Sequence, residues 1–408
     1  MKRTNSTKNR ILLLAGMTLI MLSCINTPKI ELPTPVPTFD SSTLISEVSV
    51  QDSSDWLLMQ MDTPVLEPRP QNNPQLVIGL DGRLHLFWDT MGSADAFIYH
   101  SYMQDGAWSV PSAISLSLGT SKLYTSPVVS PDGVIHVLWK NELKLGGPYR
   151  LLYAQFDGSA WSEEVEVLVF EKDSSLWGEL FVDEQSIIHA IVKASDGMHS
   201  NFFYLTQSGN NWESSEPIAP KTGLDGLVIW QYKPLSSGKV LLYGKDLSRN
   251  LRLSYWEAGE TGSVVKTNIH LPIYVDYFVD NFNNYYIYWT GQVPIPGGTT
   301  TGAYYQCIDA EPHLWLETIL SGEKTVITKP LVAQNKSLSV MSWINRDNTI
   351  EFLFPKGCDS ANVYSLALPE SKTQKQLVAL VVNESPNGLC FLNKHNYNEF
   401  ELYCSKIP

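Results

Sequence analysis

The feature that most constrains the fold is an internal repeat of a hairpin-like segment. Residues 74–88 (PQLVIGLDGRLHLFW) recur as residues 126–139 (SPVVSPDGVIHVLW), and more loosely as residues 178–189 (GELFVDEQSIIH). Each copy is an apolar run, a turn and a second apolar run, which is typical of a β-hairpin. A repeat with a period of about 50 residues decides the architecture, so it has to be interpreted before any site is sought.

Each hairpin is followed by a third strand and then by a fourth strand that begins near a tryptophan. Third strands are expected at residues 97–102, 150–156, 202–206, 251–256, 303–307, 350–354 and 400–404. First strands are expected to start near residues 74, 125, 177, 232, 275, 329 and 376. No 3.6-residue period is sustained, so helices are not expected. The pattern predicts an all-β fold, a β-propeller of seven blades with four antiparallel strands each, although six or eight blades also fit the divergent later units.

The two ends of the array predict how the propeller closes. The last unit has three strands, near residues 376–383, 388–394 and 399–404, and no fourth. An orphan strand at 55–61 precedes the first unit and begins near Trp56, as the fourth strands do. We expect this N-terminal strand to complete the last blade, which removes the exposed edges that an open array would present.

The first 24 residues predict an export signal. Basic residues precede an apolar run, Ile11–Leu22, which is too short to span a bilayer. The following Ser23 and Cys24 resemble the end of a bacterial lipobox, with Met21 at the place where Leu is usual. This resemblance implies that Cys24 is lipidated and becomes the new N-terminus. An ordinary signal peptide with an incidental cysteine is the alternative.

The predicted organisation is a signal peptide (1–24), a stalk rich in Pro, Thr and Ser (25–50) and the propeller (51–408). This order places the protein in a bacterial cell envelope, facing outside the cytoplasm, with the lipid bilayer as one partner. The chain has 29 basic and 42 acidic residues and a formal net charge of −13. Because so acidic a chain repels phosphate backbones, no nucleic-acid partner is expected.

Cysteine usage agrees with an oxidising compartment. With Cys24 lipidated, four cysteines remain, and these allow three pairings. Cys390 and Cys404 flank a hairpin, so they would face each other across two strands, which predicts a disulfide. Cys307 and Cys358 would then pair by elimination. No CxxC pair occurs and the eight histidines are scattered, so neither a metal site nor a cofactor is expected.

The turns before the fourth strands contain a degenerate motif. It reads Asp157-Gly-Ser-Ala-Trp161 in one unit and Gly209-Asn-Asn-Trp212 in the next, and a shorter version ends at Trp108. These turns resemble the Asp boxes of sialidase-like, BNR-type propellers, over about residues 55–404 and in architecture more than in motif. The resemblance implies one of two functions. Its catalytic members are hydrolases that remove terminal sialic acids, and other members only bind glycans or proteins.

The connections between second and third strands are longer than the turns, so a binding surface is expected on the side where they emerge. These predicted loops are 89–96, 140–149, 194–201, 244–250 and 290–302. The candidate ligand-binding residues are Arg150, Arg249 and Arg346, at or beside second-to-third loops, together with Tyr285 and Tyr286, which belong to a tyrosine cluster of the fifth unit whose rings could stack on a sugar. The repeated His85, His136 and His189, and the repeated tryptophans, are expected to pack in the core.

Sialidase chemistry would need three arginines around the carboxylate of the sugar, a Tyr–Glu pair and an acid–base Asp. Only six arginines follow the signal, and the family's entry motif, Tyr/Phe-Arg-Ile-Pro, is absent. No catalytic residue is therefore assigned. The sequence favours a non-catalytic binding module for a glycan or a protein, with a sialidase-like glycoside hydrolase as the alternative.

Overall fold

The computed structural model describes residues 48–52, 59–61, 71–90, 97–115, 121–143, 147–170, 175–183, 185–195, 200–209, 211–214, 228–234, 240–245, 250–257, 260–270, 274–279, 285–295, 298–308, 318–319, 331–334, 338–344, 349–355, 361–367, 376–384, 387–396 and 399–406. The chain divides into two compact units, Met1–Leu44 and Ile45–Pro408, and every described residue belongs to the second. In these ranges the secondary structure is strand throughout, joined by turns. The described part of the chain contains no helix with the length and hydrophobicity that crossing a membrane would need.

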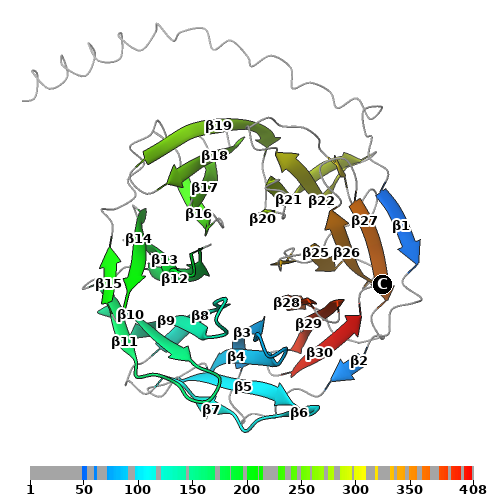
Figure 1. Ribbon diagram of the computed structural model, residues 1–408. Coiled ribbons are helices and arrows are strands. Elements are labelled where there is room, and N and C mark those ends of the chain that lie inside the picture. Colours follow the sequence, from blue (N-terminus) through cyan, green and yellow to red (C-terminus); the bar gives the residue numbers. More distant parts are fainter. Residues whose placement is uncertain are drawn as a thin grey trace, which may run out of the picture. The chain divides into compact units, whose positions relative to one another are not determined.

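The described strands form seven sheets, numbered here by their order along the chain, and neighbouring strands are antiparallel except where β1 joins the sixth sheet (Figure 1). The first sheet contains β3 (Gln71–Ile78), β4 (Leu84–Thr90), β5 (Ile98–Gln104), β6 (Ala107–Trp108) and β7 (Ser112–Ala113). The second contains β8 (Ser121–Val129), β9 (Ile135–Glu142), β10 (Tyr149–Phe156) and β11 (Val165–Phe170). The third contains β12 (Ser175–Val182), β13 (Ile188–Ser195), β14 (Ser200–Ser208) and β15 (Asn211–Ser214).

The later sheets repeat this order. The fourth contains β16 (Val228–Pro234), β17 (Val240–Lys245), β18 (Asn250–Glu257) and β19 (Glu260–His270). The fifth contains β20 (Tyr274–Val279), β21 (Tyr285–Ile295), β22 (Gly298–Ile308) and β23 (Thr318–Ile319). The sixth contains β24 (Leu331–Gln334), β25 (Ser339–Ile344), β26 (Thr349–Pro355) and β27 (Ala361–Ala367). The seventh contains β28 (Gln376–Glu384), β29 (Asn387–Asn396) and β30 (Glu399–Lys406).

Two N-terminal strands complete the last two sheets (Figure 1). Strand β2 (Met59–Met61) is antiparallel to β30 and pairs Met59 with Cys404, so the N-terminal segment supplies the fourth strand of the seventh sheet as predicted. Strand β1 (Val48–Asp52) is parallel to β27 and makes the sixth sheet five-stranded. This second strand was not predicted, and it begins inside the segment that was expected to be stalk. The remainder of the predicted orphan strand, with Trp56, lies outside the described residues.

Neighbouring sheets pack through apolar faces, which is how a β-propeller buries its core. One cluster joins the first and second sheets, with Phe87, Ile98, Val137, Trp139 and Leu152 fully or almost fully buried. A second joins the second and third sheets, and a third joins the sixth and seventh. Leu402 of the seventh sheet lies among apolar residues of the first, so the end of the chain packs against its beginning. The fold is a β-propeller, and the sequence pattern predicted it.

The predicted disulfide also belongs to this closure. Cys390 and Cys404 are directly opposite each other on β29 and β30 and form a disulfide. Both half-cystines pack against the cluster that joins the seventh sheet to the first. The second predicted pair stays a prediction, because Cys358 lies outside the described residues.

Candidate functional site

Each sheet has two ends that differ in the connections they carry. In the second sheet, β8 and β9 meet at Val129 and Ile135 across a short turn, and Glu142 of β9 pairs with Tyr149 of β10 at the opposite end. We call the first kind of end the turn end and the second the loop end. The long second-to-third connections, where binding residues were predicted, emerge at the loop ends.

The loop end of the third sheet presents an exposed indole. Trp177, on the first strand β12, is 45% exposed. It is paired with Lys193 on β13, which is paired in turn with Phe202 on β14. Residues paired in this way carry their side chains on the same side of the sheet. The ammonium of Lys193 lies 5.9 Å from the centre of the Phe202 ring, and partial burial lowers the pKa of Lys193.

The second sheet has a lysine at the equivalent place, four residues after the repeated histidine. The ammonium of Lys140 lies 4.1 Å from the centre of the Tyr149 ring, a cation–π distance. Burial lowers the pKa of Lys140, and the nearby Glu142 carboxylate acts in the opposite direction. The first sheet has Asp89 at this place, and Asp89 is fully buried. One position of the repeat therefore carries different charged groups in successive sheets.

Arg150, a predicted ligand residue, lies at the loop end of the second sheet. Its Nη1 donates a 3.5 Å hydrogen bond to Oε2 of Glu166 on the neighbouring strand β11. The Nε atom is buried and makes no hydrogen bond to any described residue. The guanidinium is thus partly occupied by a carboxylate of its own sheet, which competes with a carboxylate on a ligand.

The other predicted ligand residues are not brought together with Arg150 in the described structure. Arg249 and Arg346 lie outside the described residues, in the second-to-third connections of the fourth and sixth sheets. Tyr285 begins β21. Tyr286 follows it and is fully buried, so it packs in the core and offers no surface to a ligand. Ile287, Tyr288 and Trp289 are buried as well, so both faces of this part of β21 are covered.

One predicted binding loop is a hairpin instead. Residues 290–302 were expected to form a long loop, but β21 and β22 stay paired until Ile295 faces Gly298. Several β-branched residues in this segment, among them Val293 and Thr300, favour extended pairing over a loop.

At the turn ends the repeated histidines are buried, as predicted, and each joins a turn to the third strand. His136 contacts the Tyr153 hydroxyl through Nδ1 at 2.5 Å and the Ser130 hydroxyl through Nε2 at 2.9 Å. His189 contacts Thr206 through Nδ1 at 3.1 Å and Asp183 through Nε2 at 3.0 Å. Within the described ranges, no three His, Cys, Asp or Glu side chains gather as a metal site would require.

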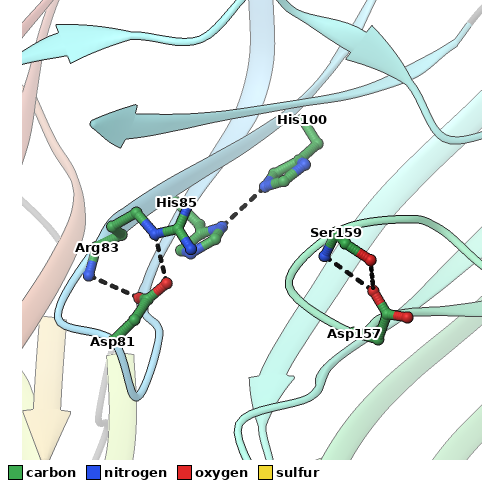
Figure 2. Close-up of polar contacts among 6 residues, drawn as sticks. All are labelled: Asp81, Arg83, His85, His100, Asp157 and Ser159. Carbon is green, nitrogen blue, oxygen red and sulfur yellow. Dashed lines mark hydrogen bonds and ion pairs between the residues drawn. The ribbon is translucent and has the colours of Figure 1, made fainter. Parts of the chain in front are cut away.

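In the first sheet this histidine pairs with another histidine (Figure 2). The Nδ1 atom of His85 lies 2.9 Å from Nε2 of His100, and the two rings are parallel within 1°. Trp161 of the second sheet donates a hydrogen bond to Nδ1 of His100 at 3.3 Å. His100 therefore accepts at Nδ1 and donates from Nε2, which is the pattern of a neutral ring. Burial lowers the pKa of His85 to about 4 and that of His100 to about 3.

The turn before each histidine is stabilised by an aspartate. Asp81 accepts a hydrogen bond from the backbone N–H of Arg83 at 2.9 Å and forms an ion pair with the Arg83 side chain (Figure 2). In the third sheet, Asp183 accepts from the N–H groups of Gln185 and Ile187. The turn hydrogen bonds place Asp183 two positions earlier in its turn than Asp81 in its own, which agrees with their spacing of six and four residues before His189 and His85.

The Asp-box-like turn of the second sheet joins this sheet to the first. Asp157 Oδ1 accepts hydrogen bonds from the N–H groups of Ser159 and Ala160, both at 2.8 Å, and the contact with Ser159 is drawn in Figure 2. These hydrogen bonds, led by that of Ala160, lower the pKa of Asp157 to about 2. The turn directs Trp161 onto His100, at a ring-centre distance of 5.2 Å. Trp161 is thus part of the packing between two sheets, as predicted.

Trp177 and Lys193 were missed as candidate site residues. The sequence patterns singled out tryptophans of the second and fourth strands as core, and Trp177 belongs to neither class, since it lies at the start of a first strand. Its position at the loop end, beside the polar Glu179 two residues later, was the signal that could have indicated an exposed side chain.

Comparisons with known proteins give similarity of structure only. No known family profile matches the sequence, and no curated protein sequence does. A protein of unknown function from Dyadobacter fermentans is 10% identical with a TM-score of 0.47, over 86% of this chain and 98% of that one. An α-L-arabinofuranosidase from Fusarium graminearum is 14% identical with a TM-score of 0.46, over 70% and 92%. A sialidase from Trypanosoma rangeli is 9% identical with a TM-score of 0.44, over 83% and 55%. Likeness at this level assigns neither an activity nor a ligand to this chain.

Proposed function

We propose that this protein is a lipid-anchored receptor of the bacterial cell envelope whose propeller binds a glycan, without catalysis, at the loop ends of its second and third sheets. The observation that carries the proposal is the exposed Trp177 on a first strand, with the lysine of the next strand directly beside it.

The side chains of Trp177, Lys193 and Glu179 have the chemistry that binds a sugar ring. A pyranose has an apolar face of C–H groups and an edge of hydroxyls. The face can stack on an indole, while the hydroxyls accept hydrogen bonds from an ammonium group. Trp177 supplies the apolar surface and Lys193 a charged donor on the same side of the sheet. Glu179, on that side as well, adds acceptor oxygens for hydroxyl protons.

A glycan fits this surface better than a protein partner does. Stable protein interfaces bury about 800 Å² on each partner and centre on a cluster of apolar anchors. The described loop ends of these two sheets expose three large apolar side chains close to a connection, Trp177, Leu143 and Val169, and Trp177 is the aromatic one. One exposed aromatic side chain beside charged groups is an arrangement that suits a small polar ligand with one apolar face.

The anchoring part of the proposal rests on the sequence of the first 24 residues. A basic start, a short apolar run and Ser23-Cys24 support export followed by lipidation of Cys24. The disulfide between Cys390 and Cys404 agrees with an oxidising compartment.

The test of binding is a glycan-array screen with the full chain in detergent, followed by titration of the best ligand. We expect Trp177→Ala to weaken binding by about 2 kcal/mol, because the stacking surface of a central aromatic residue is lost. Lys193→Met should weaken it less, since the alkyl chain remains and only the charge is removed.

The matched control is Val110→Ala. Val110 is 88% exposed and lies between β6 and β7 of the first sheet, away from its loop end. Its replacement should leave the affinity unchanged. Equal losses in the Trp177 and Val110 variants, or a ligand that binds the Trp177→Ala variant as tightly as the parent, would contradict the proposed site.

A further inference from the structure

The chain enters the propeller from a turn end, and this bears on how the protein is oriented at a membrane. Strand β1 is parallel to β27 and places Val48 opposite Ala361, the first residue of β27. Strand β27 starts where the third-to-fourth connection of the sixth sheet ends, because Pro355 of β26 also pairs with Ala361. Val48 therefore lies at the turn end of this sheet, and β1 runs from there toward the loop end.

We propose that the turn ends of the sheets face the bilayer and that the loop ends, with Trp177, face away from it. This inference rests on the proposed lipidation of Cys24. The anchored chain is attached to the body at Val48, so a pull from the lipid acts on the turn-end side. The side of the propeller to which the anchored chain is attached then lies nearest the membrane.

Exposed aliphatic side chains at the turn ends favour the same orientation. Leu80, at the tip of the first turn, is 63% exposed, and Ile187, in the corresponding turn of the third sheet, is 39% exposed. Leu80 also reaches the neighbouring turn, where its Cδ1 would lie 3.4 Å from a Cβ placed on Gly133. Aliphatic residues at the tips of such turns can touch the interfacial region of a bilayer, where their burial is favourable.

The charges of these turns indicate which lipid surface they tolerate. Asp81 and Arg83 form an ion pair, which leaves little net charge on the first turn. Asp132 and Asp157 add carboxylates in the second sheet, and the pKa of each is lowered by hydrogen bonds of its own turn. Both carboxylates stay ionised at neutral pH. Contact with a zwitterionic surface is therefore preferred, and an anionic surface repels these turns.

The proposed orientation also leaves the loop ends accessible to ligands. A binding face turned toward the bilayer would meet the membrane's own headgroups, whereas a face turned away meets ligands that arrive from outside. Strands of eight residues, such as β12, are about 26 Å long, so the two ends differ in height by about that distance.

The test uses the full lipidated chain in phosphatidylcholine vesicles, with a fluorophore on one added cysteine and an acceptor dye on the lipid headgroup. Leu80→Cys places the donor at a turn end, and Leu143→Cys, where the leucine is 39% exposed, places it at a loop end. The parent chain without an added cysteine gives the background from Cys307 and Cys358. We expect clearly higher energy transfer from position 80 than from position 143. Equal transfer, or higher transfer from position 143, would overturn the orientation.

Flotation of the vesicles separates this inference from the proposed function. A parent chain that fails to float, or a Cys24→Ala chain that floats equally well, overturns the lipid anchor and the orientation together. A parent chain that floats in a Cys24-dependent manner but shows no label difference overturns the orientation alone. Glycan binding in detergent depends on neither outcome.

Discussion

Single residues in the first-to-second turns hold a backbone conformation that most side chains avoid. The third position after the start of the turn has φ of 76° at Gly82, 91° at Gly133 and 66° at Ser186. Gly82 has nothing within 4 Å of the place where a Cβ would be added, so only the backbone conformation opposes a larger residue there. A residue with a Cβ is disfavoured in this region by about 1 kcal/mol or more.

We therefore expect Gly82→Ala to lower the free energy of unfolding by about 1 kcal/mol. Ser186→Gly should raise it by about 0.5 kcal/mol, because relief of the left-handed conformation outweighs the greater freedom of glycine in the unfolded chain. Urea unfolding of both variants beside the parent measures the two changes. Shifts of the same sign would contradict this account of the turn.

Three buried histidines should make the protein sensitive to acid. In the folded state the pKa values of His85 and His136 are lowered to about 4 and that of His100 to about 3, each mainly by burial, against about 6.5 in the unfolded chain. The unfolded state thus binds more protons in this range. The full stability is present above pH 6.5 and is lost as the pH falls from there toward 4 and 3.

We expect the melting temperature to fall steadily between pH 7 and pH 4, and His100→Phe to make that fall shallower. Phenylalanine keeps the ring contacts with Phe87, Phe156 and Trp161 but does not titrate. The variant loses the hydrogen bond to His85 and should be less stable at pH 7. The slope against pH, measured by thermal melts, is therefore the informative quantity, and an unchanged slope would show that His100 does not contribute to it.

Residue-level prediction from the sequence succeeded where a residue repeats and failed where it does not. The histidines and Trp161 recur in register, so their burial could be inferred from the repeat. The exposure of Trp177 and the burial of Tyr286 depend on how fully neighbouring parts of the chain cover each strand. Residues 286–289 are buried on both faces of β21, and a dense run of tyrosines gives no pattern from which to infer that.

At the scale of elements, the third strands and the starts of the first strands were predicted to within a few residues. Hairpins are local, and their turns carry Gly and Asp at fixed offsets, so the sequence is informative about them. Strand β1 escaped prediction because its pairing with β27 joins residues more than 300 positions apart. Nothing in a short polar segment such as VSVQD indicates a partner at that distance.

The disulfide of the seventh sheet links β29 to the strand on which β2 closes the propeller. Cys390 and Cys404 are separated by 14 residues, and a covalent loop of that length stabilises the fold by about 3 kcal/mol in the chain-entropy model. We expect the double variant Cys390→Ala, Cys404→Ala to melt several degrees below the parent, and the reductant dithiothreitol to lower the melting temperature of the parent by more than that of the variant. A parent that is insensitive to the reductant at accessible temperatures, yet far more stable than the variant, would point to lost packing against the first sheet instead.

At the scale of the whole molecule, the closure of the propeller by an N-terminal strand was predictable from the number of strands in each repeat. The last repeat lacked a strand and the first was preceded by one, and β2 on β30 joins them. Function is less predictable, since a propeller presents many loop ends and the repeat does not say which of them are used. The described structure favours the loop ends of the second and third sheets as the binding surface. Trp177 is exposed in the third sheet, and Arg150 lies beside Glu166 in the second.

The charge of the whole molecule argues against sialidase activity. The formal net charge is −13, and loss of the predicted signal, with its four basic residues, would make it more negative. A negative field repels an anionic sugar, so a pocket for it would need concentrated positive charge. The candidate arginines belong to the second, fourth and sixth sheets by their place in the sequence, and Arg150 already donates to Glu166.

We therefore expect the purified protein to show no turnover above background on a fluorogenic sialoside, at any pH at which it stays folded. Arg150→Ala, Arg249→Ala and Arg346→Ala should at most change ligand binding, because no step of a reaction would depend on them. A heat-denatured sample gives the background rate, and a known sialidase in the same buffer shows that the assay works. Clear turnover that disappears in one of the three variants would establish the enzyme. It would also mean that the loop ends carry a local positive field strong enough to overcome the charge of the rest of the molecule.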